Sequence, residues 1–200
     1  MKGSIVIVSF FVAGVLTGMA GIWTSSGPWD DYTRYALYLL MFLVGASLGA
    51  GGKIREMFRS LGIKTLLVPI ATITGTLAFS ALSALMISQY SVYDCMAVGS
   101  GFGYYSLSSV FITQYKGAEL GTVALMTNIF REIITLLFAP LLVRFFSPLA
   151  PICAGGATTM DTTLGVITRF SGREYVFIAV FHGAVVDFTV PFFVTFFCGL

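Results

Sequence analysis

The chain has 200 residues, of which 57% are hydrophobic and only 10% are charged, and its mean hydropathy is +0.93. Soluble domains carry about 25% charged residues, so this composition excludes a soluble globule. The formal net charge of +2, with no basic patch among aromatic residues, gives no sign of a nucleic-acid partner. The chain is predicted to be an all-α, polytopic transmembrane helix bundle of about seven spans, since each membrane helix needs about 20 apolar residues.

The predicted spans form a single integral membrane domain over residues 1–200, joined by short loops. The first apolar run is long for a signal peptide and lacks a clear cleavage site, so it is interpreted as a retained span. The spans are expected at residues 4–24, 33–52, 63–88, 95–115, 120–146, 149–170 and 174–198.

The basic residues predict an orientation. The segment GGKIREMFRSLGIK carries Lys53, Arg55, Arg59 and Lys64. Seven spans with a cytoplasmic N-terminus place this segment in the cytoplasm, as the positive-inside rule requires. The same topology places Lys2, Lys116, Arg169 and Arg173 inside, and only Arg34 and Arg144 outside.

The second half contains an internal repeat. ITQYKGAE at Ile112–Glu119 aligns with ITRFSGRE at Ile167–Glu174, and the same offset pairs Gly101 with Gly156 and Glu132 with Asp187. Two spans per copy would make the repeat parallel. A chance match in a low-diversity membrane sequence is the alternative.

Several ionisable residues are expected deep inside spans, where a charge costs about 2.5–3.5 kcal/mol on insertion scales and is usually functional. Asn128 precedes Arg131 and Glu132 by three and four residues, which puts all three on about one helix face. A substrate or proton site is the functional interpretation, and an ion pair that locks two helices is the structural one.

Asp161 lies in GGATTMDTT, after Gly155 and Gly156 and among hydroxyls that include Thr159 and Thr162. Glycine and β-branched residues weaken a helix, and transporters often unwind helices near the membrane midplane to bind ions or substrates. Asp161 would then match an ammonium group. Packing through small residues, with Asp161 bonded to threonines, is the alternative.

A second glycine-rich polar segment, GSGFGYYSLSS, is expected to face the first. Its tyrosine rings could contact an ammonium and its hydroxyls could line a site, although close helix packing would also explain it. The residues concerned are Gly101, Gly103, Tyr104, Tyr105, Ser106 and Ser108.

His182 and Asp187 are five residues apart in AVFHGAVVDFTVPFF. A lone histidine is more often a hydrogen-bonded packing residue, but a proton relay stays open because its charge changes near physiological pH. Cys95, Cys153 and Cys198 form no CxxC pair and are interpreted as packing residues, so neither a metal nor a cofactor is expected. The absence of GxSxG and HExxH motifs gives no sign of an enzyme.

Taken in order, LYLLMFLVGASLG, GSGFGYYSLSS, NIFREII, GGATTMDTTLGVITRFSG and VFHG resemble the lysine exporter (LysO) family of bacterial membrane proteins. The resemblance implies a secondary transporter of the inner membrane that exports L-lysine and its analogues, driven by a proton or sodium gradient. It also implies a role for buried acids, with Glu132 in the RE motif and Asp161 in the ATxMDxTL motif.

Members of that family are often longer at the N-terminus. The rival interpretation is therefore a non-transporting membrane subunit whose missing spans come from a small partner chain, and a homodimer is a further arrangement. A sodium-coupled carrier of anionic substrates fits less well, because buried acids outnumber buried bases.

Overall fold

The computed structural model describes residues 63–200, together with the isolated positions 13, 16–20, 32, 35, 39 and 42. The chain divides into two units, Met1–Leu43 and Val44–Leu200, and the features below belong to the second. Apart from those isolated positions, the spans expected at residues 4–24 and 33–52 lie outside the described residues.

Three long helices dominate the described part of the chain: α4 (Ile63–Ser83), α7 (Ala118–Phe145) and α10 (Val176–Cys198). Within this part, three helical stretches are long and apolar enough to cross a membrane, at Thr65–Ser83, Ala118–Phe145 and Arg173–Cys198. The described residues contain no strand. The all-helical class is therefore confirmed.

The segment between α4 and α7 is a hairpin of two short helices, α5 (Val92–Gly99) and α6 (Tyr105–Lys116). A capping box starts α5, in which Ser91 Oγ accepts from the Asp94 N–H at 3.1 Å and the carboxylate accepts from the Ser91 N–H. The Lys116 ammonium at the end of α6 lies 3.3 Å from Asp94 Oδ1. The chain thus returns to the end of the molecule from which α5 started.

A second hairpin lies between α7 and α10. It comprises α8 (Ala150–Gly155), the 3-10 turn η1 (Gly156–Met160) and α9 (Leu164–Phe170), and the short η2 (Arg173–Tyr175) leads into α10. Ile152 of α8 and Ile167 of α9 belong to one buried cluster. Both arms of this hairpin therefore contribute to one core cluster, together with Val68 of α4 and Ala179 of α10.

Each of the spans expected at 95–115 and 149–170 is interrupted and consists of two short helices. Hydropathy alone does not distinguish one span from two short helices with the same apolar content. The helical path breaks where the chain needs left-handed backbone, at Phe102 (φ 46°) and Gly103 (φ 97°) in the first hairpin and at Gly156 (φ 64°) in the second. The interruption expected around Gly155–Asp161 is present, and α-helix resumes only at Leu164.

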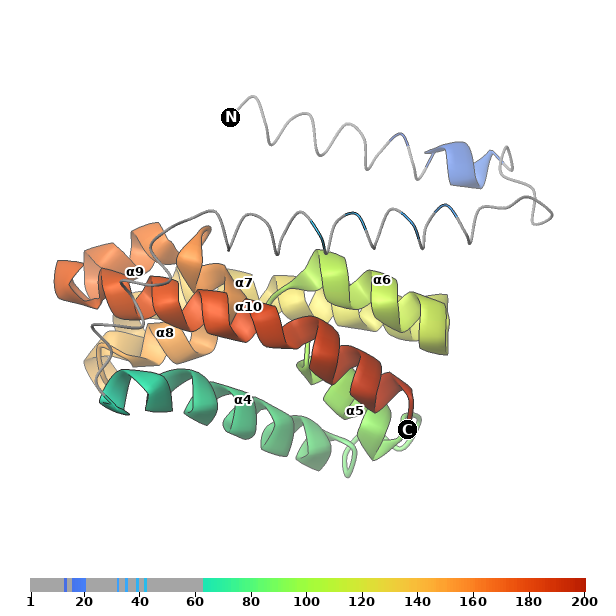
Figure 1. Ribbon diagram of the computed structural model, residues 1–200, viewed down its shortest axis with the longest axis horizontal. Coiled ribbons are helices and arrows are strands. Elements are labelled where there is room, and N and C mark those ends of the chain that lie inside the picture. The colour runs from blue at the N-terminus through green and yellow to red at the C-terminus, as the bar shows by residue number, and fades with distance from the viewer. Residues whose placement is uncertain are drawn as a thin grey trace. The chain divides into compact units, whose positions relative to one another are not determined.

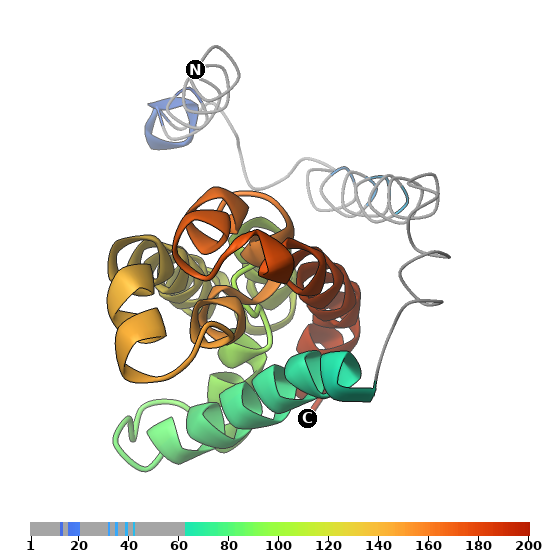
Figure 2. The same cartoon turned by 90° about the vertical axis from the view of Figure 1, so that its left-hand side faces the viewer.

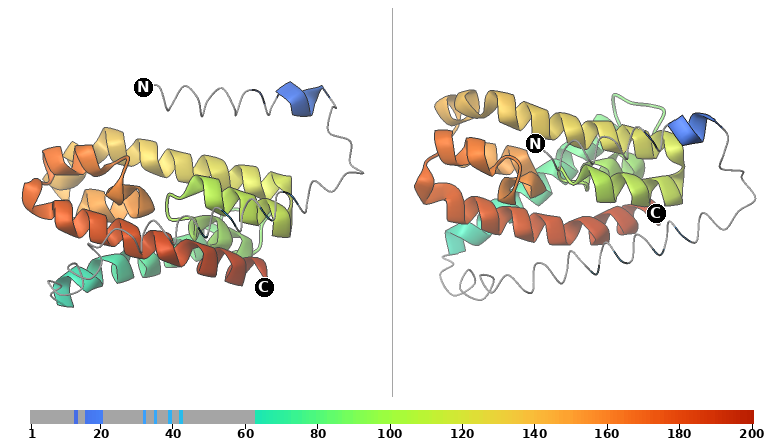
Figure 3. Two further views of the ribbon diagram at one scale, coloured as in Figure 1. Left: turned by 45° about the horizontal axis from the view of Figure 1, so that its top comes forward. Right: turned by 90° about the horizontal axis from the view of Figure 1, so that it is seen from above.

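Both hairpins contact α7 and α10, while α4 contacts α5, α8 and α10. Figures 1 and 3 show α5 and α6 near one end of the long helices and α8 and α9 near the other. Figure 2 gives the end-on view with the second hairpin toward the reader.

The hairpin tips meet backbone to backbone. The Ala157 N–H donates to the Phe102 carbonyl at 2.9 Å. A Cβ on Gly156 would collide with that carbonyl oxygen, so a residue without a side chain is required at this contact.

Candidate functional site

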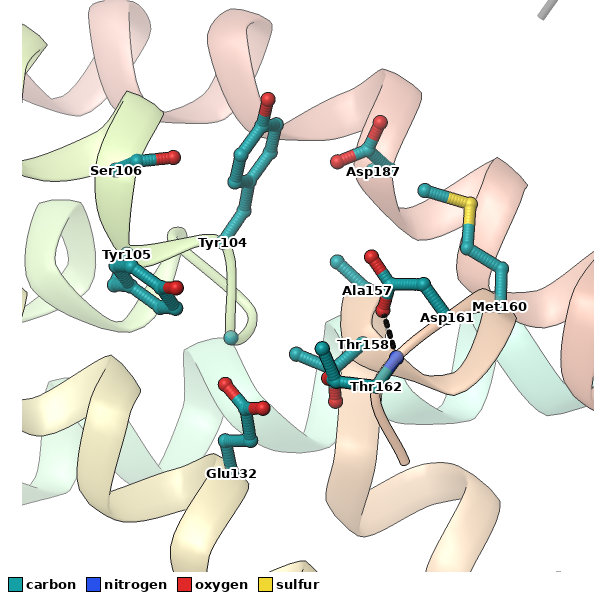
Figure 4. Close-up of a pocket in the computed structure, with 11 residues that line it drawn as sticks. Tyr104, Tyr105, Ser106, Glu132, Ala157, Thr158, Met160, Asp161, Thr162 and Asp187 are labelled. Atoms are coloured by element: carbon teal, nitrogen blue, oxygen red, sulfur yellow. Dashed lines mark hydrogen bonds between the residues drawn. The ribbon is translucent and has the colours of Figure 1, made fainter. Parts of the chain in front are cut away.

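A cavity of about 310 Å³ lies beside the junction of the two hairpins, at the lower end of the size range of small-molecule pockets, about 300–1,000 Å³. Figure 4 shows its lining side chains. They come from both hairpins, α7 and α10: Gly103, Tyr104, Tyr105, Ser106, Glu132, Ala157, Thr158, Met160, Asp161, Thr162 and Asp187.

Three carboxylates from three different elements share this pocket (Figure 4). Glu132 comes from α7, Asp187 from α10, and Asp161 from the turn after η1, where its Oδ1 accepts from the Thr162 N–H. Asp187 is only 4% exposed. The lining residues include no lysine, arginine or histidine, so the pocket is chemically matched to a cation.

Two of the three acids lie at the mid-length of long helices. Glu132 stands halfway along α7 (Ala118–Phe145), and Asp187 halfway along α10 (Val176–Cys198). A helix that crosses a bilayer has its middle near the midplane. Carboxylates at that depth need a cation, a proton or water.

Polar and aromatic groups of the first hairpin face the acids. Tyr104, Tyr105 and Ser106 lie across the pocket from Asp187 and Asp161 in Figure 4. Tyrosine rings attract ammonium groups through their π faces, and the three hydroxyls can donate to a substrate carboxylate. The pocket therefore offers partners for a cationic group and for a hydrogen-bond acceptor.

Asn128 holds the first hairpin in its interrupted form. Its side chain is 2% exposed, and its Oδ1 accepts from the Gly103 N–H at 2.7 Å. Its Nδ2 donates to the carbonyls of Ala124 and Val98 at 2.9 and 3.4 Å. The buried amide therefore gives hydrogen-bond partners to backbone groups that the interrupted helix does not pair. Backbone groups inside a membrane need such partners.

Arg131 holds the second hairpin. Its Nε donates to the Ala154 carbonyl at 2.8 Å and its Nη2 to the Cys153 carbonyl at 3.0 Å, both in the last turn of α8. Its Nη1 lies 3.4 Å from Thr76 Oγ1 of α4. Arg131 does not line the acid pocket, although Glu132 beside it does, because adjacent helical residues diverge by about 100°.

His182 is fully buried between three elements. The Thr159 hydroxyl lies 2.8 Å from the carbonyls of Gly156 and Ala179 and 3.2 Å from His182 Nδ1. His182 Nε2 lies 2.9 Å from the Thr72 hydroxyl, so each ring nitrogen has a threonine hydroxyl as its hydrogen-bond partner.

The pocket brings together eight residues singled out from the sequence: Gly103, Tyr104, Tyr105, Ser106, Glu132, Asp161, Thr162 and Asp187. Eight others lie outside its lining and are placed in the hairpins or their supports: Gly101, Ser108, Asn128, Arg131, Gly155, Gly156, Thr159 and His182. The lining also includes Ala157, Thr158 and Met160, which belong to the same polar stretch but were not among the predicted site residues. Thr72 and Thr76, the partners of His182 and Arg131, were not predicted either, because they lie in an otherwise apolar helix.

These features define a class of protein, the helical membrane proteins in which interrupted helices enclose a polar site. A profile of the lysine exporter LysO family matches residues 8–198. The chain belongs to that family.

Two relatives give the same result. The chain is 30% identical over 194 residues to the lysine exporter LysO of Escherichia coli strain K12, which covers 96% of this chain and 62% of that protein. It is 33% identical over 164 residues to a putative lysine exporter of Haemophilus influenzae, with 82% of each chain covered. No solved structure matches the chain.

Proposed function

We propose that this chain is the transport core of an exporter for a cationic amino acid, L-lysine or a close analogue, in the bacterial inner membrane. The supporting observation is the pocket itself, in which Glu132, Asp161 and Asp187 converge with no basic side chain among them. The names of both relatives point to the same substrate.

The mechanism proposed for this pocket follows from its charges. Three carboxylates that enclose a small space repel one another, and a bound cation relieves that repulsion. An ammonium group binds between the acids, while the hydroxyls of Tyr104, Tyr105 and Ser106 orient the carboxylate. An acid left without an ammonium partner carries the coupling proton or sodium ion.

The proposal also orients the described helices. Lys64, Arg144, Arg169 and Arg173 lie at the end of the long helices where α4 begins, and Lys116 lies at the other end. The positive-inside rule assigns the first end to the cytoplasm. In this orientation Lys116 lies outside and Arg144 lies inside, the reverse of what the sequence predicted. The basic residues remain concentrated on the cytoplasmic side.

The test is lysine counterflow into liposomes that contain the purified chain. The double variant Glu132→Gln, Asp161→Asn should lower the initial rate at least about tenfold, because each change removes a charge-assisted partner of the substrate. Glu119→Gln is the matched control, since this carboxylate binds Gln89 and Tyr90 away from the pocket. Full transport by the double variant would contradict the proposal.

The chain spans 62% of the length of the Escherichia coli relative. A second candidate function is a membrane subunit that transports only with a partner chain or as a homodimer. Lysine binding without counterflow by the chain alone, and recovery of counterflow when a partner is co-reconstituted, would favour this candidate.

A further inference from the structure

We propose that α5–α7 and α8–α10 are two copies of one hairpin-plus-helix unit, inserted in opposite directions, and that the acid pocket lies on the pseudo-twofold axis between them. In this arrangement Ser106 occupies, in the first copy, the position that Asp161 occupies in the second. The assignment of substrate contacts rests on the proposed function, whereas the inverted architecture does not.

The equivalence of the two units has a backbone signature. Gly117, between the first hairpin and α7, has φ 97° and ψ 167°, and Gly172, between the second hairpin and α10, has φ 111° and ψ 157°. These glycines are paired by the same offset that aligns ITQYKGAE with ITRFSGRE. Each unit is therefore a broken hairpin, a glycine turn of one conformation, and a long helix.

The opposite directions follow from the path of the chain. The first hairpin returns to its starting end, where Lys116 meets Asp94, and α7 then runs to the other end as the only long helix of that unit. The second hairpin starts from that other end and also returns to it, because Leu149 at its start and Tyr175 at its end pack against the same buried cluster. Each copy therefore crosses the membrane once, so the second copy is inverted relative to the first. Two crossings per copy would instead give a parallel repeat.

The axis passes through the contact of the hairpin tips. Phe102 and Ala157, which are joined by a backbone hydrogen bond of 2.9 Å, are themselves equivalent under the offset. Eight of the eleven lining residues then form four equivalent pairs, as expected for a site on an axis: Gly103 with Thr158, Tyr105 with Met160, Ser106 with Asp161, and Glu132 with Asp187.

This symmetry assigns roles within the pocket. Glu132 and Asp187 form the symmetric acidic pair. The pair that differs in charge is position 106 with position 161, a hydroxyl against a carboxylate. An ammonium group is therefore held toward the second hairpin and the neutral hydroxyl side receives the rest of the substrate. Inverted repeats can exchange conformations, which exposes one central site to either side of the membrane in turn.

The architecture is tested with cysteine reporters at two equivalent exposed positions, Ala118→Cys and Arg173→Cys, after replacement of Cys95, Cys153 and Cys198 by serine. A membrane-impermeant maleimide should label Ala118→Cys in intact spheroplasts and Arg173→Cys in inverted vesicles, because the two reporters are expected on opposite sides of the membrane. Labelling of both from the same side overturns the inverted repeat. If the cysteine-free chain does not fold, only the partly exposed Cys153 is replaced, because Cys95 and Cys198 are buried.

The equivalence within the pocket is tested by moving the carboxylate. The variant Asp161→Ser should raise the Kd for lysine about tenfold or more. Adding Ser106→Asp should recover at least half of that change in log Kd. The matched control adds Gln114→Asp to Asp161→Ser, because Gln114 is exposed on the same helix and lies outside the pocket lining. Equal binding by the two double variants overturns the equivalence.

The two failures are distinguishable. Absence of lysine binding by the unaltered chain contradicts the proposed substrate, while the maleimide result still decides the architecture. Same-side labelling with normal lysine binding contradicts the inverted repeat alone.

Discussion

A single turn of α7 directs three polar side chains to three different partners. Asn128 binds the backbone of the first hairpin, Arg131 binds the last turn of α8, and Glu132 enters the pocket. The guanidinium and the amide compensate carbonyl and N–H groups that interrupted helices would leave unpaired. Positioning of the hairpins and chemistry of the pocket are thus encoded within five consecutive residues of one helix.

Asn128→Ala should destabilise the protein by about 1–3 kcal/mol, because it leaves the Gly103 N–H buried without an acceptor. Thermal unfolding in detergent measures the effect as a lower Tm. Thr127→Ala is the control, since the neighbouring side chain is exposed and lies outside the acid pocket. Equal Tm values for the two variants would contradict the role assigned to the amide.

His182 is expected to position the second hairpin rather than to relay protons. His182→Asn should lower the Tm, because it disturbs the hydrogen bonds to Thr159 and Thr72, but should leave the shape of the transport profile between about pH 5 and 8 unchanged. A flattened profile in this variant would instead assign the imidazole to proton transfer.

At the scale of elements, the contact between the hairpin tips depends on glycine. Gly156→Ala places a Cβ against the Phe102 carbonyl and forces alanine to φ 64°, and the backbone strain alone costs about 1–3 kcal/mol. Gly165→Ala in α9 meets nothing within 4 Å and should change stability by less than about 1 kcal/mol. Unfolding curves that show equal stability for both variants would contradict the observed tip contact.

At the start of the first hairpin, outside the long helices, Asp94 contacts Ser91 and Lys116 in a pH-sensitive cluster that is called the clamp below. Desolvation raises the pKa of Asp94, but hydrogen bonds from Ser91 and the Lys116 ammonium outweigh it, so the pKa lies below the ordinary 3.8. The ionised carboxylate therefore stabilises the fold above pH 3.8, and this stabilisation is lost as pH falls through the lower folded-state pKa.

The difference in Tm between the unaltered chain and Asp94→Asn should consequently shrink as the pH is lowered from about 5 to 3. A melting series in a pH-stable detergent measures it, at low salt because the pair is partly exposed. A difference that grows on acidification would contradict the clamp.

At the scale of the whole molecule, composition was sufficient to predict an all-helical membrane protein, and the glycine and threonine run was sufficient to predict the break before Asp161. The hairpins were not predictable by hydropathy, which reports apolar length but not whether the chain turns back at Gly103 or Gly156. The return of the chain is visible only in the structure, where Lys116 lies close to Asp94.

The pocket was predictable in part for a related reason. Carboxylates in apolar segments are conspicuous, so Glu132, Asp161 and Asp187 were all recognised, and the structure places them in one cavity. Arg131 is equally conspicuous but lies outside the cavity lining, since the helix turns it toward α8. Thr72 gave no signal, because a lone hydroxyl in an apolar helix is ordinary.

The central claim, that the acid pocket binds a cationic amino acid, is tested most directly by equilibrium binding of L-lysine to the purified chain and to Asp161→Asn. The unaltered chain should bind lysine and not glutamate, and the variant, which keeps the shape of the side chain but loses its charge, should bind lysine at least about tenfold more weakly. Equal lysine affinity in both proteins, or tighter binding of glutamate than of lysine, would contradict the claim.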